Sequence, residues 1–181
     1  MNRELAFRLV AVTPWLLVLC VYDIRERRLP NGWTLGGLAL ALVYCLGYGG
    51  IELFASSLLA GVLAGLFLLI PFFLHAAGGG DVKMLSAAGV IVGISEVVNL
   101  LFFMSIAGFV LAISMWCAGK VNGSRLKHYF RVCFDMGYDR EAGKKALPPC
   151  SSEKCRVPFG VAIAAGVWMT LLWNLYNGGR P

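Results

Sequence analysis

Two aspartates, Asp23 and Asp81, are the residues of this sequence whose type and position best suit them to chemistry. Asp23 ends an apolar stretch, and Asp81 follows three consecutive glycines at 78–80. Ionisable groups at the ends of membrane helices are costly and usually functional. If two carboxyl groups meet at one depth, they can share a proton. The ionised one then takes a proton from water while the protonated one polarises a peptide carbonyl. This pattern predicts aspartic-protease chemistry, which requires no metal and no cofactor.

Only 10 residues are acidic, and few of the others compete for this role. Seven of the others are expected at outer helix ends, in an outer turn or in a polar stretch: Glu4, Glu52, Glu96, Asp135, Asp139, Glu141 and Glu153. Each candidate also has a structural reading. Asp81 is well suited to cap the start of a helix, and Asp23 belongs to a charged cluster beside Arg25. Spacing alone leaves open whether the two carboxylates meet.

The elements that carry these aspartates are apolar. The chain has 181 residues, of which 59% are hydrophobic and 14% are charged. An average soluble domain is about 45–50% apolar and about 25% charged. This composition rules out a soluble globular enzyme, a disordered tail and a secreted disulfide scaffold. We expect one membrane-embedded domain, residues 1–181.

The apolar runs predict an all-α, polytopic membrane protein with about six transmembrane helices. A helix that spans the bilayer needs about 20 largely apolar residues. The fourth run is shorter, so it would cross only if it is tilted or packed inside the bundle. The predicted helices are 5–22, 33–49, 52–74, 82–95, 97–117 and 158–176.

The basic residues predict the orientation. Of the 16 Lys and Arg residues, 13 fall on one side of the predicted helices, nine of them between Lys120 and Arg156. Because cytoplasmic loops are enriched in Lys and Arg, that side is cytoplasmic and the N-terminus lies outside. Asp23 and Asp81 then share the cytoplasmic face. The basic excess marks topology and favours a lipid bilayer as a partner, and nucleic acid is not expected.

The polar stretch at about 118–157 is predicted to be a cytoplasmic loop. Apolar residues recur within it at helical spacing, from Leu126 to Phe134. Two interpretations stay open for this segment. It forms a short helix on the membrane surface, or it is a solvated loop with a few aromatic residues.

Around the aspartates the sequence resembles the type IV prepilin peptidases, which are GxGD membrane aspartic proteases. The segments Asp23-Ile24-Arg25 and Leu29-Pro30-Asn31 resemble the family's D-x-R-x-x-x-[IL]-P-N motif. Gly78-Gly79-Gly80-Asp81 matches its G-x-G-D motif, and Pro158-Phe159-Gly160 resembles the P-[FY]-G element before its last helix. The three motifs occur in order along nearly the whole chain.

The resemblance implies a role for each matching position. Asp23 and Asp81 would be the catalytic pair of an aspartic endopeptidase. Four further residues would shape the active site or the substrate's approach, and two cations would tune its electrostatics. The shaping residues are Gly78, Gly80, Pro158 and Gly160, and the cations are Arg25 and Lys83.

The resemblance also implies a substrate and a location. Such enzymes remove the basic leader from prepilins or pseudopilins at the cytoplasmic face of the bacterial inner membrane. Pilus or secretion assembly subunits would be further partners. Long family members carry paired CxxC motifs associated with N-methylation, and this chain has no CxxC pair. It therefore looks like the short Flp/Tad-type form, without methyltransferase activity.

Two other classes of function are compatible with paired intramembrane aspartates. In a transporter, the two carboxylates would bind a cation or relay protons. In a membrane scaffold of a pilus or secretion assembly, they would have no catalytic role. Leader cleavage by variants of Asp23 and Asp81 discriminates among the three classes.

Overall fold

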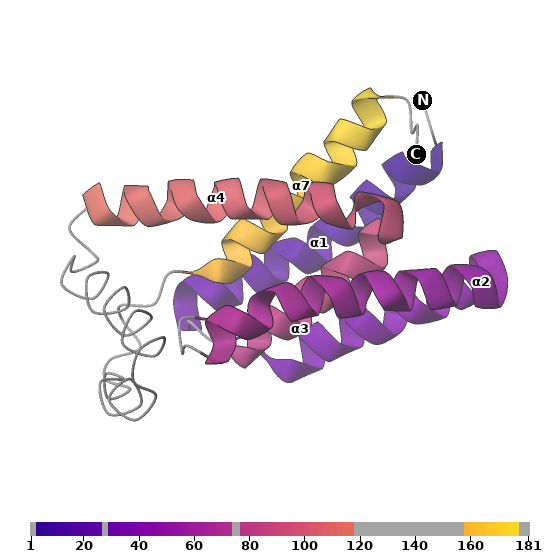
Figure 1. Ribbon diagram of the computed structural model, residues 1–181, viewed down its shortest axis with the longest axis horizontal. Helices are drawn as coiled ribbons and strands as arrows, with labels where there is room; N and C mark the ends of the chain where they lie inside the picture. The colour runs from indigo at the N-terminus through magenta and orange to yellow at the C-terminus, as the bar shows by residue number, and fades with distance from the viewer. Residues whose placement is uncertain (1–2, 27–28, 74–76, 118–157, 178–181) are drawn as a thin grey trace, which may run out of the picture. The chain divides into compact units, whose positions relative to one another are not determined.

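The computed structural model describes residues 3–26, 29–73, 77–117 and 158–177. Every regular element in these ranges is helical, which confirms the all-α prediction for the described part of the chain. The predicted loop at 118–157 lies outside the described residues. The elements, drawn in Figure 1, are α1 (Arg3–Glu26), α2 (Asn31–Phe73), α3 (Gly79–Val92), the 3-10 turn η1 (Ile94–Glu96), α4 (Val97–Cys117) and α7 (Phe159–Tyr176).

The chain divides into two compact units. The first comprises residues 1–109 and 158–181, and the second comprises residues 110–157. The described residues of the second unit are 110–117, the last part of α4. All of the candidate site residues belong to the first unit.

Helix α2 consists of two helical arms joined at Gly50, where the backbone has φ 66° and ψ −160°. Glycine adopts this conformation readily because it has no Cβ. The arms run in opposite directions, as Figure 1 shows. Asn31 in the first arm bonds Lys83 of α3, and a Cβ on Gly65 in the second arm would meet Ser86 of α3. A straight helix would separate Asn31 from Gly65 by about 50 Å. The two arms lie where the sequence predicts two separate helices.

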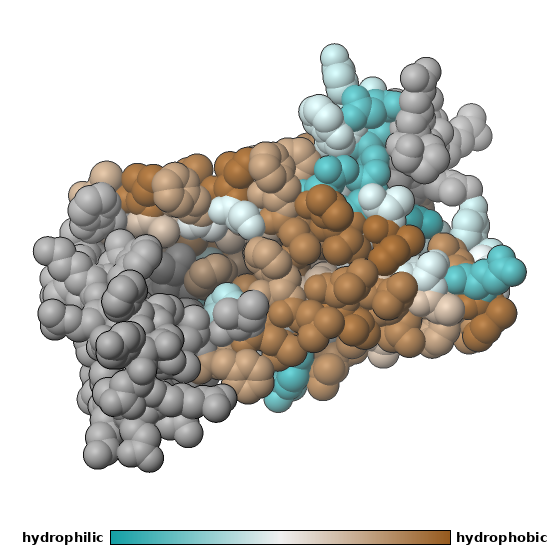
Figure 2. All heavy atoms as spheres, viewed as in Figure 1, coloured by the Kyte–Doolittle hydropathy of each residue, from teal (hydrophilic) through white to brown (hydrophobic). Residues whose placement is uncertain are grey.

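Among the described residues, four helices are long and apolar enough to cross a membrane. Their outer faces carry large exposed apolar side chains, and Figure 2 shows hydrophobic residues over much of α2. Helix α3, with 14 residues, is shorter than the usual span of about 20. The predicted number of six spans and the outward N-terminus stay predictions. The four candidate spans are Phe7–Glu26, Asn31–Phe73, Ile94–Met115 and Phe159–Tyr176.

Half of the residues of helix α3 are buried, the same share as in α7, and α3 packs against α2 and α7. Met84 and Leu85 are fully buried in the core. Small residues let α2 and α3 approach closely, as they do in other membrane bundles. A Cβ on Gly89 would lie 2.7 Å from the carbonyl oxygen of Ala60. The sequence leaves two arrangements open for this short run, tilted or packed inside the bundle, and this packing agrees with the second.

Helix α7 runs antiparallel to α1. The indole Nε1 of Trp168 donates a hydrogen bond to Thr13 Oγ1 at 3.2 Å, midway along both helices. Gly160, near the start of α7, meets Asp23 near the end of α1. The packing therefore brings the amino end of α7 to the carboxyl end of α1.

Candidate active site

Asp23 lies in the last turn of α1 and is 5% exposed. Its carboxylate faces the first turn of α7, where a Cβ on Gly160 would lie 2.8 Å from Oδ2 and 3.1 Å from Cγ. The first backbone N–H groups of a helix have no partner within the helix and carry a partial positive charge. Asp23 is therefore a buried carboxylate placed at the positive end of a neighbouring helix.

The start of α7 is set by Pro158, which occupies the N-cap position with φ −71° and ψ 86°. Proline holds φ near this value and has no backbone N–H to leave unsatisfied. Helix α7 then begins at Phe159, and Gly160 is its second residue. The predicted shaping residues Pro158 and Gly160 thus fix where α7 begins and leave space beside it for Asp23.

Asp81 lies in the first turn of α3, and one of its carboxylate oxygens has a fixed orientation. The backbone N–H of Gly78 donates to Asp81 Oδ2 at 2.9 Å. Gly78 is the N-cap residue, with extended φ −85° and ψ 153°. A carboxylate in the first turn also interacts favourably with the helix dipole. Asp81 therefore supports the start of its helix from the third helical position, whereas the N-cap position that the sequence suggests for it belongs to Gly78, and this bond orients its side chain.

The two glycines predicted to shape the site have different neighbours. A Cβ on Gly78 would lie 3.2 Å from Asp81 Oδ2, so glycine at this position leaves room for the hydrogen bond. A Cβ on Gly80 would lie 2.9 Å from Leu29 Cβ and 3.5 Å from the Leu29 carbonyl oxygen. In this structure the space beside Gly80 is occupied by Leu29, from the connection between α1 and α2.

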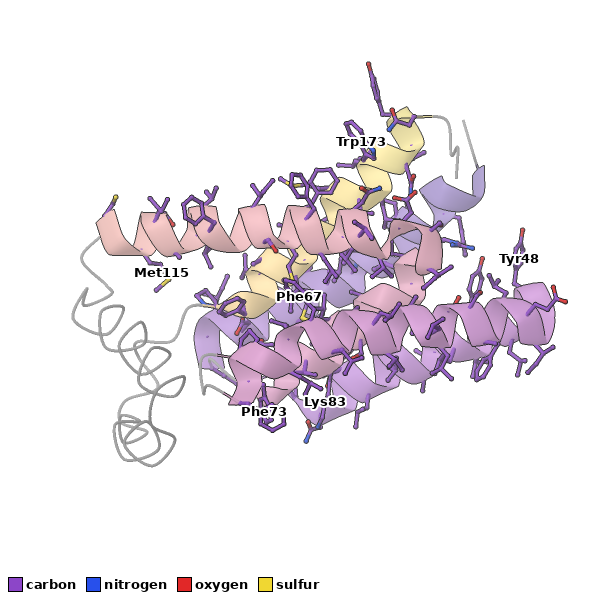
Figure 3. The ribbon with its side chains drawn as sticks, viewed as in Figure 1. Tyr48, Phe67, Phe73, Lys83, Met115 and Trp173 are labelled. Carbon is purple, nitrogen blue, oxygen red and sulfur yellow. The ribbon has the colours of Figure 1, made fainter. Side chains whose placement is uncertain are left out.

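The two predicted electrostatic residues differ in their surroundings. Lys83, labelled in Figure 3, donates from Nζ to Asn31 Oδ1 at 2.8 Å. Arg25 is exposed in the last turn of α1 and lines a shallow surface groove with residues of the same helix. Residues two apart on a helix differ by about 200° in direction, so Arg25 and Asp23 point to different sides of α1. The groove is lined by Leu17, Val18, Val21, Tyr22, Arg25 and Glu26.

Three contacts connect the three sequence motifs. Asp23 of the first motif meets Gly160 of the third, Leu29 of the first meets Gly80 of the second, and Lys83 bonds Asn31. The motifs therefore gather where α1 ends and where α2, α3 and α7 begin. Of the two aspartates, Asp23 takes part in these contacts directly, and Asp81 lies between Gly80 and Lys83 in the sequence. The pairing of Asp23 with Asp81 stays a prediction.

Sequence reasoning missed two of these contacts. The sequence identifies the Leu29-Pro30-Asn31 segment as part of a motif but predicts no partner for either Leu29 or Asn31. In the structure Leu29 packs against Gly80, and Asn31 accepts a hydrogen bond from Lys83. Leu29 and Asn31 belong to a sequence motif but have no predicted chemical role. A motif residue of that kind is consistent with a positioning role, and this is the signal that the sequence offered.

The described residues contain no group of three or more His, Cys, Asp and Glu side chains that could hold a metal ion. The cysteines in the described ranges are free thiols: Cys20, Cys45 and Cys117.

The fold and site define a helical membrane protein with a buried carboxylate where several helix ends meet. Comparison with protein families makes the class specific. The type IV leader peptidase family matches residues 10–113, which is more than half of the chain. The chain belongs to this family, and the resemblance found in its motifs is confirmed. The match includes Asp23 and Asp81 and ends before Gly160. No curated protein and no solved structure matched the chain.

Membership of this family makes the chain a leader-peptidase-like protease, and its long apolar helices make it a membrane protein. The matched range includes the last turn of α1 and the first turn of α3. The family match and the contacts between the motifs therefore include the same helix ends, those of α1 and α3.

Proposed function

We propose that this protein is an aspartic endopeptidase that removes the basic leader from prepilins, with Asp23 and Asp81 as the catalytic pair. The observation that carries the proposal is the burial of Asp23 against Gly160, at the helix ends where the motif of Asp81 also gathers. Burial of a carboxylate in an apolar bundle is costly, and ionisable groups buried in membrane helices usually mark functional sites. The family match supplies the reaction class.

The proposed chemistry uses one ionised and one protonated carboxyl group. The ionised group takes a proton from water as the water oxygen forms a bond to the scissile carbonyl carbon. The protonated group donates its proton to the carbonyl oxygen. The tetrahedral intermediate then collapses and the C–N bond breaks. The leaving nitrogen takes up the proton that the first carboxyl group received from water, and a hydroxyl of the intermediate returns its proton to the second carboxylate. The peptide is hydrolysed and the pair returns to its starting protonation.

The proposed substrate is a prepilin or pseudopilin with a short basic leader before a hydrophobic helix. Its hydrophobic segment would lie against the apolar bundle, and the leader would stay at the cytoplasmic surface. The predicted concentration of Lys and Arg on the side of the aspartates supports that orientation. We propose a multi-pass protein of the bacterial cytoplasmic membrane, of the short Flp/Tad type, that serves pilus assembly or secretion.

Co-expression with candidate prepilins tests this function. We expect wild type to shorten the prepilin by the mass of its leader, and Asp23→Asn and Asp81→Asn each to leave it intact at normal expression. Glu96→Gln is the matched control, because Glu96 is also a buried carboxylate and accepts a hydrogen bond from Asn99 at 2.6 Å. Gln at 96 can still accept that bond, so cleavage should persist.

Photocrosslinking tests the proposed side of entry. A crosslinker placed in the prepilin leader should label the peptidase on its cytoplasmic face. Labelling confined to the outer face would contradict the proposal. Wild type that fails to cleave any candidate prepilin, yet conducts ions in an aspartate-dependent way, would instead favour a transporter.

A further inference from the structure

One side-chain hydrogen bond joins the first and second aspartate motifs. Lys83 Nζ donates to Asn31 Oδ1 at 2.8 Å. Lys83 follows Asp81 by two residues on α3, and Asn31 is the first residue of α2. A hydrogen bond with a charged donor is shorter and stronger than one between neutral groups. The bond therefore couples the turn that carries Asp81 to the start of another helix.

The direction of Lys83 argues against a direct action on Asp81. Side chains at positions i and i+2 of a helix do not face each other. The ammonium group is instead directed to the amide of Asn31. The bond gives Lys83 a contact that joins two elements, in addition to the electrostatic tuning expected from the sequence, which stays a prediction.

A second contact lies on the other side of Asp81. Gly80 packs against Leu29, with room for no more than a hydrogen at its Cα, because a Cβ there would lie 2.9 Å from Leu29 Cβ. Gly80 precedes Asp81 by one residue, and Lys83 follows it by two. Two attachments that flank Asp81 restrict both the rotation and the sliding of the first turn of α3.

The start of α2, to which the first turn of α3 is attached, is itself held by hydrogen bonds. The Pro30 carbonyl oxygen accepts hydrogen bonds from the backbone N–H groups of Trp33 and Thr34, each at 3.2 Å. The indole Nε1 of Trp15 donates to the Trp33 carbonyl oxygen at 2.9 Å and so ties the start of α2 to α1. Helix α1 carries Asp23. A continuous set of contacts thus runs from the helix of Asp23 to the turn of Asp81.

We propose that Lys83 and Asn31 form a clamp that positions Asp81 relative to α1, and that Lys83 is a positioning residue for the cleavage reaction. The effect of this clamp on catalysis rests on the proposed protease function. Misplacing a reacting group by about 1 Å can cost about 10²-fold in rate. Loss of one of two attachments should have a smaller effect, because the contact between Leu29 and Gly80 remains.

A double-mutant cycle tests the clamp. We expect Lys83→Met and Asn31→Ala each to lower kcat about tenfold, within the range for a displaced reacting group, with KM changed less than about threefold. The double variant should be no slower than either single variant, because each removes the same bond. Lys83→Arg, which keeps a charged donor, should retain most of the activity. Multiplying losses in the double variant would overturn the clamp.

The pH profile separates positioning from charge tuning. A clamp predicts that Lys83→Met and Asn31→Ala leave the pH optimum unchanged. If the ammonium charge acted on the catalytic carboxyl groups, Lys83→Met alone would move the optimum, because Asn31 is neutral. That result would contradict the clamp.

Hydrogen exchange tests the clamp without any cleavage assay. Amides of residues 79–83 should exchange about five- to tenfold faster in Lys83→Met and in Asn31→Ala, because the first turn of α3 opens more readily. Asn99→Ala is the matched control, since it removes a side-chain amide that bonds Glu96 outside the site. Unchanged exchange in either clamp variant would overturn the inference. If wild type cleaves no prepilin, the proposed function fails while this measurement still decides the clamp.

Discussion

The carboxylate of Asp23 on α1 lies directly against Gly160 on α7. A methyl group added at position 160 would be 2.8 Å from Asp23 Oδ2, closer than carbon and oxygen atoms pack. The position of the buried carboxylate therefore depends on the absence of a side chain on another helix. This dependence gives the P-F-G motif a physical role, because it lets the first turn of α7 approach Asp23.

Gly160→Ala should abolish most cleavage. The added methyl must displace Asp23 or shift α7, and such a misplacement costs about 10²-fold or more in rate. Alanine is a better helix former than glycine by about 1 kcal/mol. A loss of activity with an unchanged or higher Tm would therefore come from the contact with Asp23.

Gly36→Ala is the control for that substitution. Gly36 also lies in a helix, but a Cβ there would have no atom within 4 Å. The activity of the Gly36→Ala variant should stay within about twofold of wild type, as for most surface substitutions. Comparable activity of the Gly160→Ala and Gly36→Ala variants would contradict the proposed role of Gly160.

Substitutions of Asp81 separate its capping role from its chemical role. Asn can still accept the hydrogen bond of Gly78 N–H, so Asp81→Asn should keep wild-type stability and lose cleavage. Asp81→Ala should lose cleavage and also about 1 kcal/mol of stability, the usual cost of removing a helix cap. Thermal unfolding in detergent and a leader-cleavage assay measure the two effects. If Asp81→Asn keeps full activity, Asp81 acts only as a cap.

The reversal of α2 depends on the conformation of Gly50. Gly50→Ala should destabilise the protein by about 1–3 kcal/mol, because a side chain at φ 66° and ψ −160° is strained. Gly47→Ala is the matched control, since a Cβ there meets nothing within 4 Å. Unfolding midpoints of the two variants give the comparison. Equal stability would indicate that the chain can reverse without a glycine at position 50.

The predicted topology can be tested with reporters. Six spans with the N-terminus outside place the C-terminus outside and the 118–157 segment in the cytoplasm. A reporter that is active only outside the cytoplasm should work when fused after Pro181 and fail when inserted near residue 140. The reverse pattern would place the aspartates on the wrong face for leader cleavage.

The sequence predicted the helical class better than it predicted the contacts among the candidate site residues. The apolar runs located every helix in the described ranges, because length and hydropathy largely decide which segments cross a bilayer. The predicted helices 33–49 and 52–74 are separated at residues 50 and 51. The structure adds the conformation that reverses the chain there.

Contacts between distant segments could not be predicted in the same way. Helical periodicity shows which residues share a face, but it does not show which helix packs against that face. Asp23 and Gly160 are far apart in the sequence, and only the antiparallel packing of α1 and α7 brings them together. The sequence could not predict the bond between Lys83 and Asn31 either, because a lysine side chain has many potential partners.

The most direct test of the account is the rate of leader removal by purified Asp23→Asn and Asp81→Asn in detergent or liposomes. Both variants keep the shape of the side chain and remove its acid chemistry. We predict that each lowers kcat by about 10³-fold or more, consistent with the loss of a general acid or base, while Tm stays near that of wild type. A rate within about tenfold of wild type for either folded variant, where the loss of such a group costs at least about 10²-fold, would contradict the catalytic pair.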